Sequence, residues 1–163
     1  MGLAKNIKAV VLNGNLGIKV LRLAANDIAG WVSIFRINGG FVQITGLYGI
    51  VTTVHVGAAN LQFRHSAGGV MCLATACAAA TTGTIVTLTG IPGENVIIGI
   101  GTGTDIAGNI QGGLKGSGGG VQQMGVVCGV GTIDVDWTAV TSGATRYVLT
   151  YIPIDDVAHV YSV

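Results

Sequence analysis

Two acidic residues near the end of the chain are the first candidates for chemistry. Asp134 and Asp136 alternate with apolar residues, and alternate residues of a strand point to the same face. Two neighbouring carboxylates repel each other unless they are solvated, bind a cation or pair with a basic group. We expect a salt-bridge cluster of Asp134 and Asp136 with Arg146 on a neighbouring strand. Coordination of a cation by the two aspartates is the alternative.

The other reactive residue types show no arrangement typical of an enzyme. None of His55, His65 and His159 has a partner at metal-ligand spacing, although His55 and His65 could meet across adjacent strands, together with Cys72. The glycine-rich segments lack the phosphate-binding spacings and precede no convincing helix. A Gly-x-Ser-x-Gly elbow does not occur. We therefore expect no enzymatic activity, no metal and no cofactor.

Composition excludes several further classes of protein. Of 163 residues, 50% are hydrophobic, 9% are charged and 28 are glycine, which is the reverse of a disordered chain. The 8 Lys and Arg balance 7 Asp and Glu, so we expect no nucleic-acid partner. Threonines and glycines interrupt the uncharged residues 67–92, so we expect no membrane span. Three cysteines without tight spacing indicate buried free thiols in a reducing cytosol.

Apolar and polar residues alternate with a period of two along most of the chain, which predicts strands. Turn residues separate these runs at intervals of about 8–12 residues. Asn38-Gly39-Gly40 is typical of a hairpin turn. Residues 71–80 are the only helix-compatible stretch, and residues 101–120 are expected to form an exposed loop. The expected strands are residues 18–23, 31–37, 41–45, 50–56, 61–65, 83–89, 96–100, 121–127, 130–137, 144–151 and 157–161.

These strands predict an all-β fold, an antiparallel β-sandwich or a jelly-roll-like barrel, formed by residues 16–163 as a single domain. Residues 1–15 have only weak strand character, and we expect them to form an extended N-terminal arm that carries Lys5 and Lys8. Many expected strands are apolar on both faces, so both faces need cover. The charge is also low for the surface of a monomer. We therefore predict a homo-oligomer or a component of a larger assembly.

The last third of the chain resembles a known family. Residues 131–139 lead through a Thr-Ser-Gly turn at 141–143 into Arg-Tyr-Val-Leu-Thr-Tyr-Ile-Pro-Ile at 146–154 and Ala-His-Val at 158–160. This resembles the closing hairpin of tailed-phage capsid decoration (cement) proteins, which ends in Arg/Trp-x-Leu-x-Tyr-x-Pro-Leu followed by Gly-Ala-x-Val. Residues 40–53, 71–73 and 83–90 look similar as well. The sequence departs from the pattern at Val157, where Gly is usual, and at Asp155-Asp156 before it.

The resemblance implies a bacteriophage virion structural protein. Such proteins are β-sandwich homotrimers on the capsid exterior that bind the major capsid protein and stabilise the shell, without enzymatic activity or cofactor. The protein would be made in the host cytoplasm. Residues 1–15 would lie on the capsid, with Lys5 and Lys8 contacting acidic groups. The alternatives are a tail-associated or fibre β-domain that binds a host receptor, and a non-viral oligomeric sugar-binding module.

Overall fold

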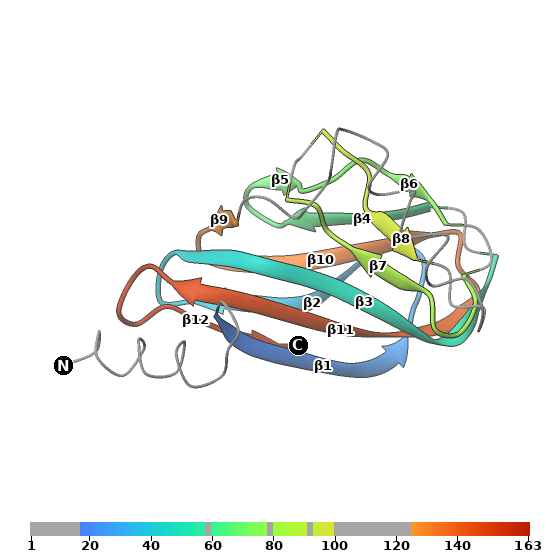
Figure 1. Ribbon diagram of the computed structural model, residues 1–163, viewed down its shortest axis with the longest axis horizontal. Coiled ribbons are helices and arrows are strands. Elements are labelled where there is room, and N and C mark those ends of the chain that lie inside the picture. The colour runs from blue at the N-terminus through green and yellow to red at the C-terminus, as the bar shows by residue number, and fades with distance from the viewer. Residues whose placement is uncertain (1–16, 58–59, 78–79, 91–92, 100–124) are drawn as a thin grey trace.

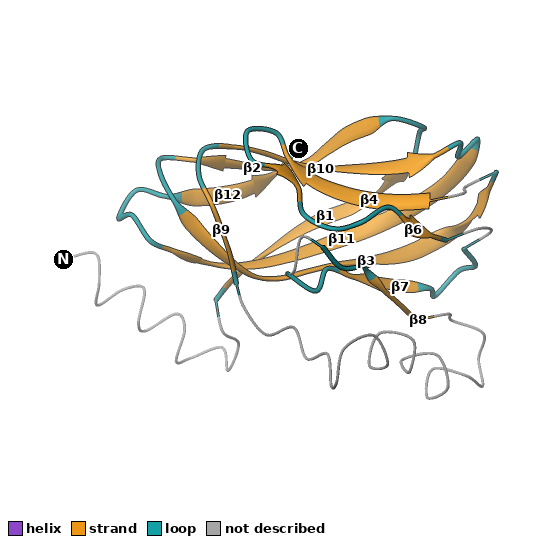
Figure 2. Cartoon of the chain, turned by 90° about the horizontal axis from the view of Figure 1, so that it is seen from above, coloured by secondary structure: helices purple, strands orange, loops and turns teal. Residues whose placement is uncertain are grey.

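The chain forms a β-sandwich of two antiparallel six-stranded sheets (Figure 1). The computed structural model describes residues 17–57, 60–77, 80–90, 93–99 and 125–163. These residues form strands joined by loops and contain no helix (Figure 2), and none of their segments is a helix able to span a membrane. The predicted antiparallel β-sandwich is therefore confirmed. The predicted N-terminal arm, residues 1–15, lies outside the described residues.

The first sheet, sheet A, has the strand order β1-β11-β3-β7-β8, and β9 also pairs with β3. The second, sheet B, has the order β12-β2-β10-β4-β5, and β6 also pairs with β4. Sheet A consists of β1 (Ile18–Asn26), β3 (Val42–Val56), β7 (Ile85–Thr87), β8 (Ile97–Gly99), β9 (Val126–Cys128) and β11 (Ser142–Pro153). Sheet B consists of β2 (Trp31–Asn38), β4 (Asn60–His65), β5 (Gly69–Val70), β6 (Thr75–Ala76), β10 (Gly131–Thr138) and β12 (His159–Ser162).

Strands from the last third of the chain occupy the middle of both sheets. In sheet A, β11 lies between β1 and β3 and pairs with both. In sheet B, β10 lies between β2 and β4. Each early strand therefore finds its central partner much later in the chain, as the pairings of Ile18 with Tyr151 and of His65 with Ile133 illustrate.

The predicted hairpin at Asn38-Gly39-Gly40 is wrong, although the turn itself is present. Gly39 and Gly40 have φ angles of 78° and 142°, values that favour glycine. The turn leads from β2 in sheet B to β3 in sheet A, so the two strands do not pair. Residues that permit positive φ reverse the chain equally well within a sheet and between two layers. The turn sequence therefore does not decide which strands become neighbours.

Two expected strands merge into one, because β3 runs without interruption through two glycines. At Gly49, an added Cβ would lie 2.9 Å from Tyr147 Cε1 and 3.0 Å from Val86 Cγ2. The glycine therefore leaves room for the buried Tyr147 ring on the neighbouring strand, rather than ending the strand.

The other expected elements differ less from those of the structure. Of the helix-compatible residues 71–80, those that are described form the short β6 and loops. In the expected strand 121–127, residues 121–124 lie outside the described part, and β9 begins at Val126. The expected loop 101–120 lies outside the described residues entirely.

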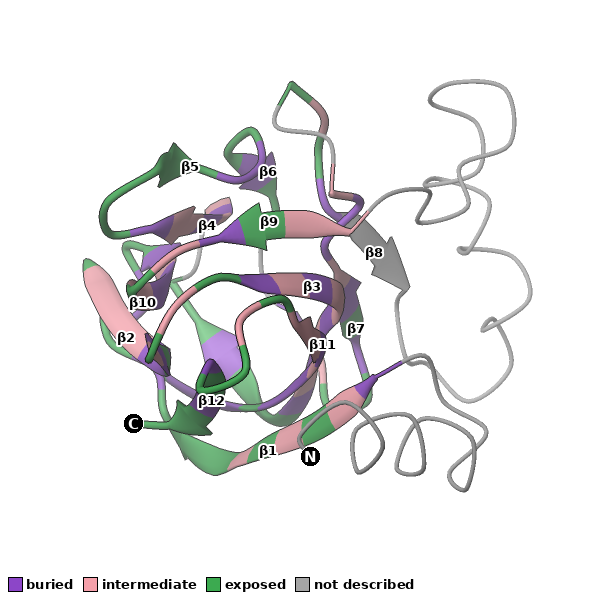
Figure 3. Cartoon of the chain, turned by 90° about the vertical axis from the view of Figure 1, so that its left-hand side faces the viewer, coloured by how far each residue is buried: buried purple, intermediate pink, exposed green. Residues whose placement is uncertain are grey.

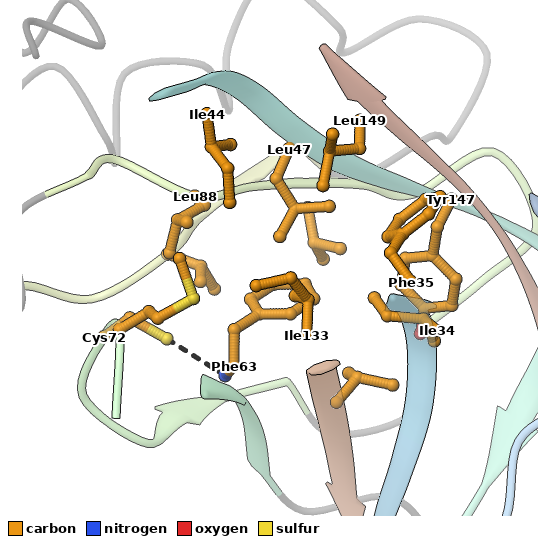
Figure 4. Close-up of a cluster of buried hydrophobic side chains, with 14 of the residues drawn as sticks. Ile34, Phe35, Ile44, Leu47, Phe63, Cys72, Leu88, Ile133, Tyr147 and Leu149 are labelled. Atoms are coloured by element: carbon orange, nitrogen blue, oxygen red, sulfur yellow. Dashed lines mark hydrogen bonds between the residues drawn. The ribbon is translucent and has the colours of Figure 1, made fainter. Parts of the chain in front are cut away.

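Apolar side chains from both sheets fill the space between them. Leu47 and Leu149 of sheet A lie opposite Phe63 and Ile133 of sheet B (Figure 4), and all four are fully buried. The sulfur of Cys72 accepts a hydrogen bond from the Phe63 amide at 3.2 Å. The three cysteines are free and buried, as predicted, and burial raises the pKa values of Cys77 and Cys128 to about 11. Their thiols therefore stay protonated and poorly reactive at neutral pH.

Candidate functional site

A cluster of hydrogen-bonding side chains is buried between the sheets. Asp27 Oδ2 accepts hydrogen bonds from Thr145 Oγ1 at 2.6 Å and from His55 Nε2 at 2.8 Å. Tyr147 donates to Asp27 Oδ1 at 3.5 Å and accepts a hydrogen bond from Trp137 Nε1 at 2.7 Å. The Trp137 ring also packs on the His55 ring, with centroids 4.0 Å apart. We call these five residues the polar network.

The polar network joins the two sheets and does not have the arrangement of a catalytic triad. In a catalytic triad the histidine uses one ring nitrogen for the nucleophile and the other for the acid. Here Thr145 and Asp27 both approach Nε2 of His55, and Nδ1 is buried without a partner. All five side chains are buried, so a substrate cannot reach them. Burial and the Asp27 charge raise the pKa of Tyr147, which keeps its hydroxyl neutral.

This network was not among the candidate sites expected from the sequence. Asp27 follows β1 in the loop before β2, and it meets a histidine 28 residues away and a threonine 118 residues away. The one signal in the sequence was His55. It occupies a position in an expected strand at which the alternation predicts an apolar residue facing the core.

The expected salt bridge of Asp134 forms with a different arginine. Asp134 Oδ2 accepts a hydrogen bond from Arg64 Nε at 2.9 Å, and Oδ1 accepts one from Ser33 at 2.8 Å. Arg146 lies on β11 in sheet A, whereas Asp134 lies on β10 in sheet B. The partner predicted from the sequence is therefore wrong, because alternation identifies the face of a strand but not the sheet to which a second strand belongs.

Asp136 lies on the same strand face as Asp134 and has its own hydrogen-bond partners. Its Oδ1 accepts a hydrogen bond from the Gly30 amide at 3.0 Å, and Oδ2 accepts one from Thr138 at 3.5 Å. Arg64 also stacks on Trp31, with Cζ 4.3 Å from the ring centroid. Hydrogen-bond donors near each carboxylate thus relieve the repulsion expected between Asp134 and Asp136. On this polar face of sheet B, both carboxylates have hydrogen-bond partners within the chain.

We expect Asp134→Asn to lower stability in a pH-dependent way. Burial raises the pKa of Asp134, but hydrogen bonds from Thr132, Ser33 and Arg64 and the Arg64 charge outweigh it, so the pKa lies below the ordinary value of 3.8. The carboxylate therefore stabilises the fold above that value, and the stabilisation is lost as the pH falls through the folded-state pKa. Urea unfolding should show a loss of about 2 kcal/mol at pH 7, and the difference should shrink towards pH 3.

Two arginine variants provide the matched comparison for this prediction. Arg64→Gln should remove part of the pH-dependent stabilisation, because it removes the partner of Asp134. Arg146→Gln should leave that pH dependence unchanged, since Arg146 lies in the other sheet. Equal effects of the two variants would contradict the assignment of Arg64 as the partner.

The two histidines whose spacing allowed a meeting across strands lie in different sheets. His55 belongs to β3 in sheet A, and His65 belongs to β4 in sheet B, where its Nε2 lies 3.1 Å from the carbonyl oxygen of Gly129. His55 and His65 therefore do not meet across adjacent strands, because their strands belong to different sheets. Within the described part of the chain, no group of three His, Cys, Asp or Glu residues is placed to hold a metal ion.

Large apolar side chains are exposed together at one end of the sandwich, which Figure 3 views directly. Each is 50–70% exposed. The backbone links them, since Ile154 N donates to Phe41 O at 2.9 Å and an added Cβ at Gly129 would touch the Phe41 ring. The members of this surface, which we call the apolar end, are Phe41, Val70, Val127, Val130, Ile154 and Val157.

The apolar end surrounds a pocket of about 370 Å³. Phe41, Val70, Val127 and Val130 line it together with His65, and none of the described residues that line it is Lys, Arg, Asp or Glu. The pocket lies between β9 of sheet A and β5 of sheet B, and each of these strands pairs with only one described strand. Such a pocket, between edge strands and rimmed by exposed apolar side chains, is typical of an interaction surface rather than a site for charged substrates.

The outer face of sheet A also carries apolar side chains. Leu21 of β1 and Tyr48 of β3 both align with Val148 of β11, and Ile50 aligns with Ile85 of β7. Leu21 and Ile85 are exposed. The outer face of sheet A is therefore apolar only in part, since Arg146 and Lys19 lie on it as well, whereas sheet B presents the polar face that contains Asp134 and Asp136.

Comparison with known proteins found no matching family model, no matching curated protein and no matching solved structure.

Proposed function

We propose that this chain is a virion structural protein, a capsid decoration protein that binds the outside of the shell as a homo-oligomer and stabilises it. The observation that carries the proposal is the exposed apolar surface, at the apolar end and on sheet A, in a chain with only 9% charged residues. A protein that works alone in solution rarely exposes large apolar patches. A protein that works in an assembly buries them against its neighbours.

The β-sandwich supports this role through its outward surfaces. The polar network is buried between the sheets and is not open to a substrate. Each copy in an oligomer can make its own weak contact with the shell. Once one copy has bound, the other copies are held close to the shell at a high effective concentration, so the oligomer as a whole binds strongly. A cementing protein needs such surfaces and does not need a catalytic pocket.

Binding to phage shells tests the proposal directly. Purified shells without a decoration layer are mixed with the protein and sedimented, and the bound protein is quantified at increasing concentration. We expect saturable binding at a fixed ratio to the capsid protein, and cryo-electron microscopy should show density at capsid symmetry axes. Binding to a glycan array with none to the shells would contradict the proposal.

Removal of residues 1–15 tests the proposed arm that carries Lys5 and Lys8. We expect roughly tenfold weaker binding to the shells, because each copy loses two cations that would contact acidic capsid groups. A Lys5→Gln/Lys8→Gln variant separates the charges from the rest of the segment and should become less sensitive to salt than the unaltered chain. Unchanged shell occupancy after removal of residues 1–15 would show that the arm makes no contact.

A further inference from the structure

The apolar end carries two unpaired opposite charges. Arg36 is exposed beside Val130, and the two residues line a second, shallow hollow of about 220 Å³. Asp156 is exposed in the loop between Ile154 and Val157, two members of the apolar end. Among the described residues the ion pairs are His55–Asp27 and Arg64–Asp134. Neither Arg36 nor Asp156 therefore meets an opposite charge within that part of the chain.

These charges make the apolar end complementary to a second copy of itself. The surface presents one cation, Arg36, and two carboxylates, Asp155 and Asp156, around a shared apolar centre. Asp155 Oδ2 accepts a hydrogen bond from the Phe41 amide at 2.6 Å, which leaves Asp156 as the exposed carboxylate without a partner among the described residues. Two copies can therefore bring Arg36 of one against Asp156 of the other while the apolar side chains meet between them. An uncharged partner would leave both charges beside a buried contact without compensation, which costs free energy.

We propose that the apolar end is the contact between copies of this chain, with Arg36 facing Asp156 of the partner subunit. The apolar side chains supply the buried area, and the charge pair fixes the relative orientation of the copies. A head-to-tail repeat of this contact forms a closed ring, such as a trimer, when the rotation between copies closes, and an open filament when it does not. This inference rests on the homo-oligomer of the proposed function, but it does not depend on capsid binding.

The edge strands at this end favour the same arrangement. β5 and β9 border the pocket, and unpaired strand edges attract further chains unless they are covered. The pocket between them has room for an apolar side chain of the neighbouring copy, because its lining contains the buried Met71 and Cys128 below the exposed valines. Contact between copies would cover both edges and the pocket at once.

A charge exchange tests the contact in the full-length chain. Analytical ultracentrifugation should give a mass of two or more times that of the 16.4 kDa monomer. Arg36→Glu and Asp156→Arg, each alone, place like charges at the contact and should weaken association by on the order of tenfold or more. The double variant Arg36→Glu/Asp156→Arg restores opposite charges and should recover the oligomer. A monomeric unaltered chain, or single variants that associate normally, would overturn the proposal.

Two matched valine variants test whether the apolar end, rather than surface charge in general, controls the association of copies. Val127→Asp places a carboxylate at the pocket, and Val56→Asp places one at the far end of β3, at positions that are 57% and 55% exposed. We expect only Val127→Asp to produce monomers, while circular dichroism and thermal unfolding show that both variants fold. Equal loss of association in both variants would show that general surface charge, rather than this contact, controls assembly. If the unaltered chain forms the oligomer but does not bind the shells, the contact between copies stands and the proposed function is contradicted instead.

Discussion

Gly143→Ala is expected to destabilise the protein by about 3 kcal/mol or more, since strain and overpacking add. Gly143 has a φ of 142°, and an added Cβ would overlap His55 Cδ2 and lie 2.9 Å from His55 Cγ. The His55 ring cannot move aside freely, because Asp27 holds its Nε2 and Trp137 packs on its face. Urea unfolding followed by tryptophan fluorescence measures the loss.

Gly30→Ala serves as the control for backbone strain. Gly30 also has a positive φ, 95°, but an added Cβ there would have nothing within 4 Å. This variant should cost only about 1 kcal/mol, because it carries strain without a clash. Equal losses for the two alanine variants would mean that contact with His55 contributes nothing.

Asp27→Ala is expected to have an effect of similar size, about 4 kcal/mol. The substitution removes the acceptor shared by His55, Thr145 and Tyr147 and leaves these buried donors without a partner. Thermal unfolding should show a large fall in midpoint, with loss of the near-ultraviolet dichroism of the buried Trp137.

A double-mutant cycle with Thr145→Val tests whether the network acts as a unit. Thr145→Val removes one donor to Asp27 and should cost about 1–2 kcal/mol alone. In the double variant Asp27→Ala/Thr145→Val the losses should fall short of the sum by more than about 0.5 kcal/mol, because one hydrogen bond is counted in both single variants. Simple additivity would show that the two side chains are energetically independent.

The strands were largely predictable because apolar and polar residues alternate with a period of two along most of the chain. In β4, Gln62 and Arg64 alternate with the buried Leu61 and Phe63, as the sequence indicated. The sandwich followed from the number of such strands and the turns between them. The exposed apolar surface also follows from the low charge, although the sequence alone did not locate it at one end.

The pairing of strands and the partners of the charged residues were not predictable, since both depend on contacts between distant segments. Alternation placed Asp134 and Asp136 on one face correctly, but Arg64 and Arg146 both occupy polar positions of strands. Only the sheet order decides between them. The polar network shows the same limit, because a single buried aspartate in a loop has no periodic signature.

The central positions of β10 and β11 determine the order in which this protein can fold. Strands β1 to β4 lack their middle neighbours until residues 131–153 are available, so neither sheet can form from the first half of the chain. Contacts between such distant segments slow folding, because a long loop must close before any of them forms. Folding should therefore follow rather than accompany synthesis of most of the chain. Until then the apolar early strands have unpaired edges that are open to aggregation.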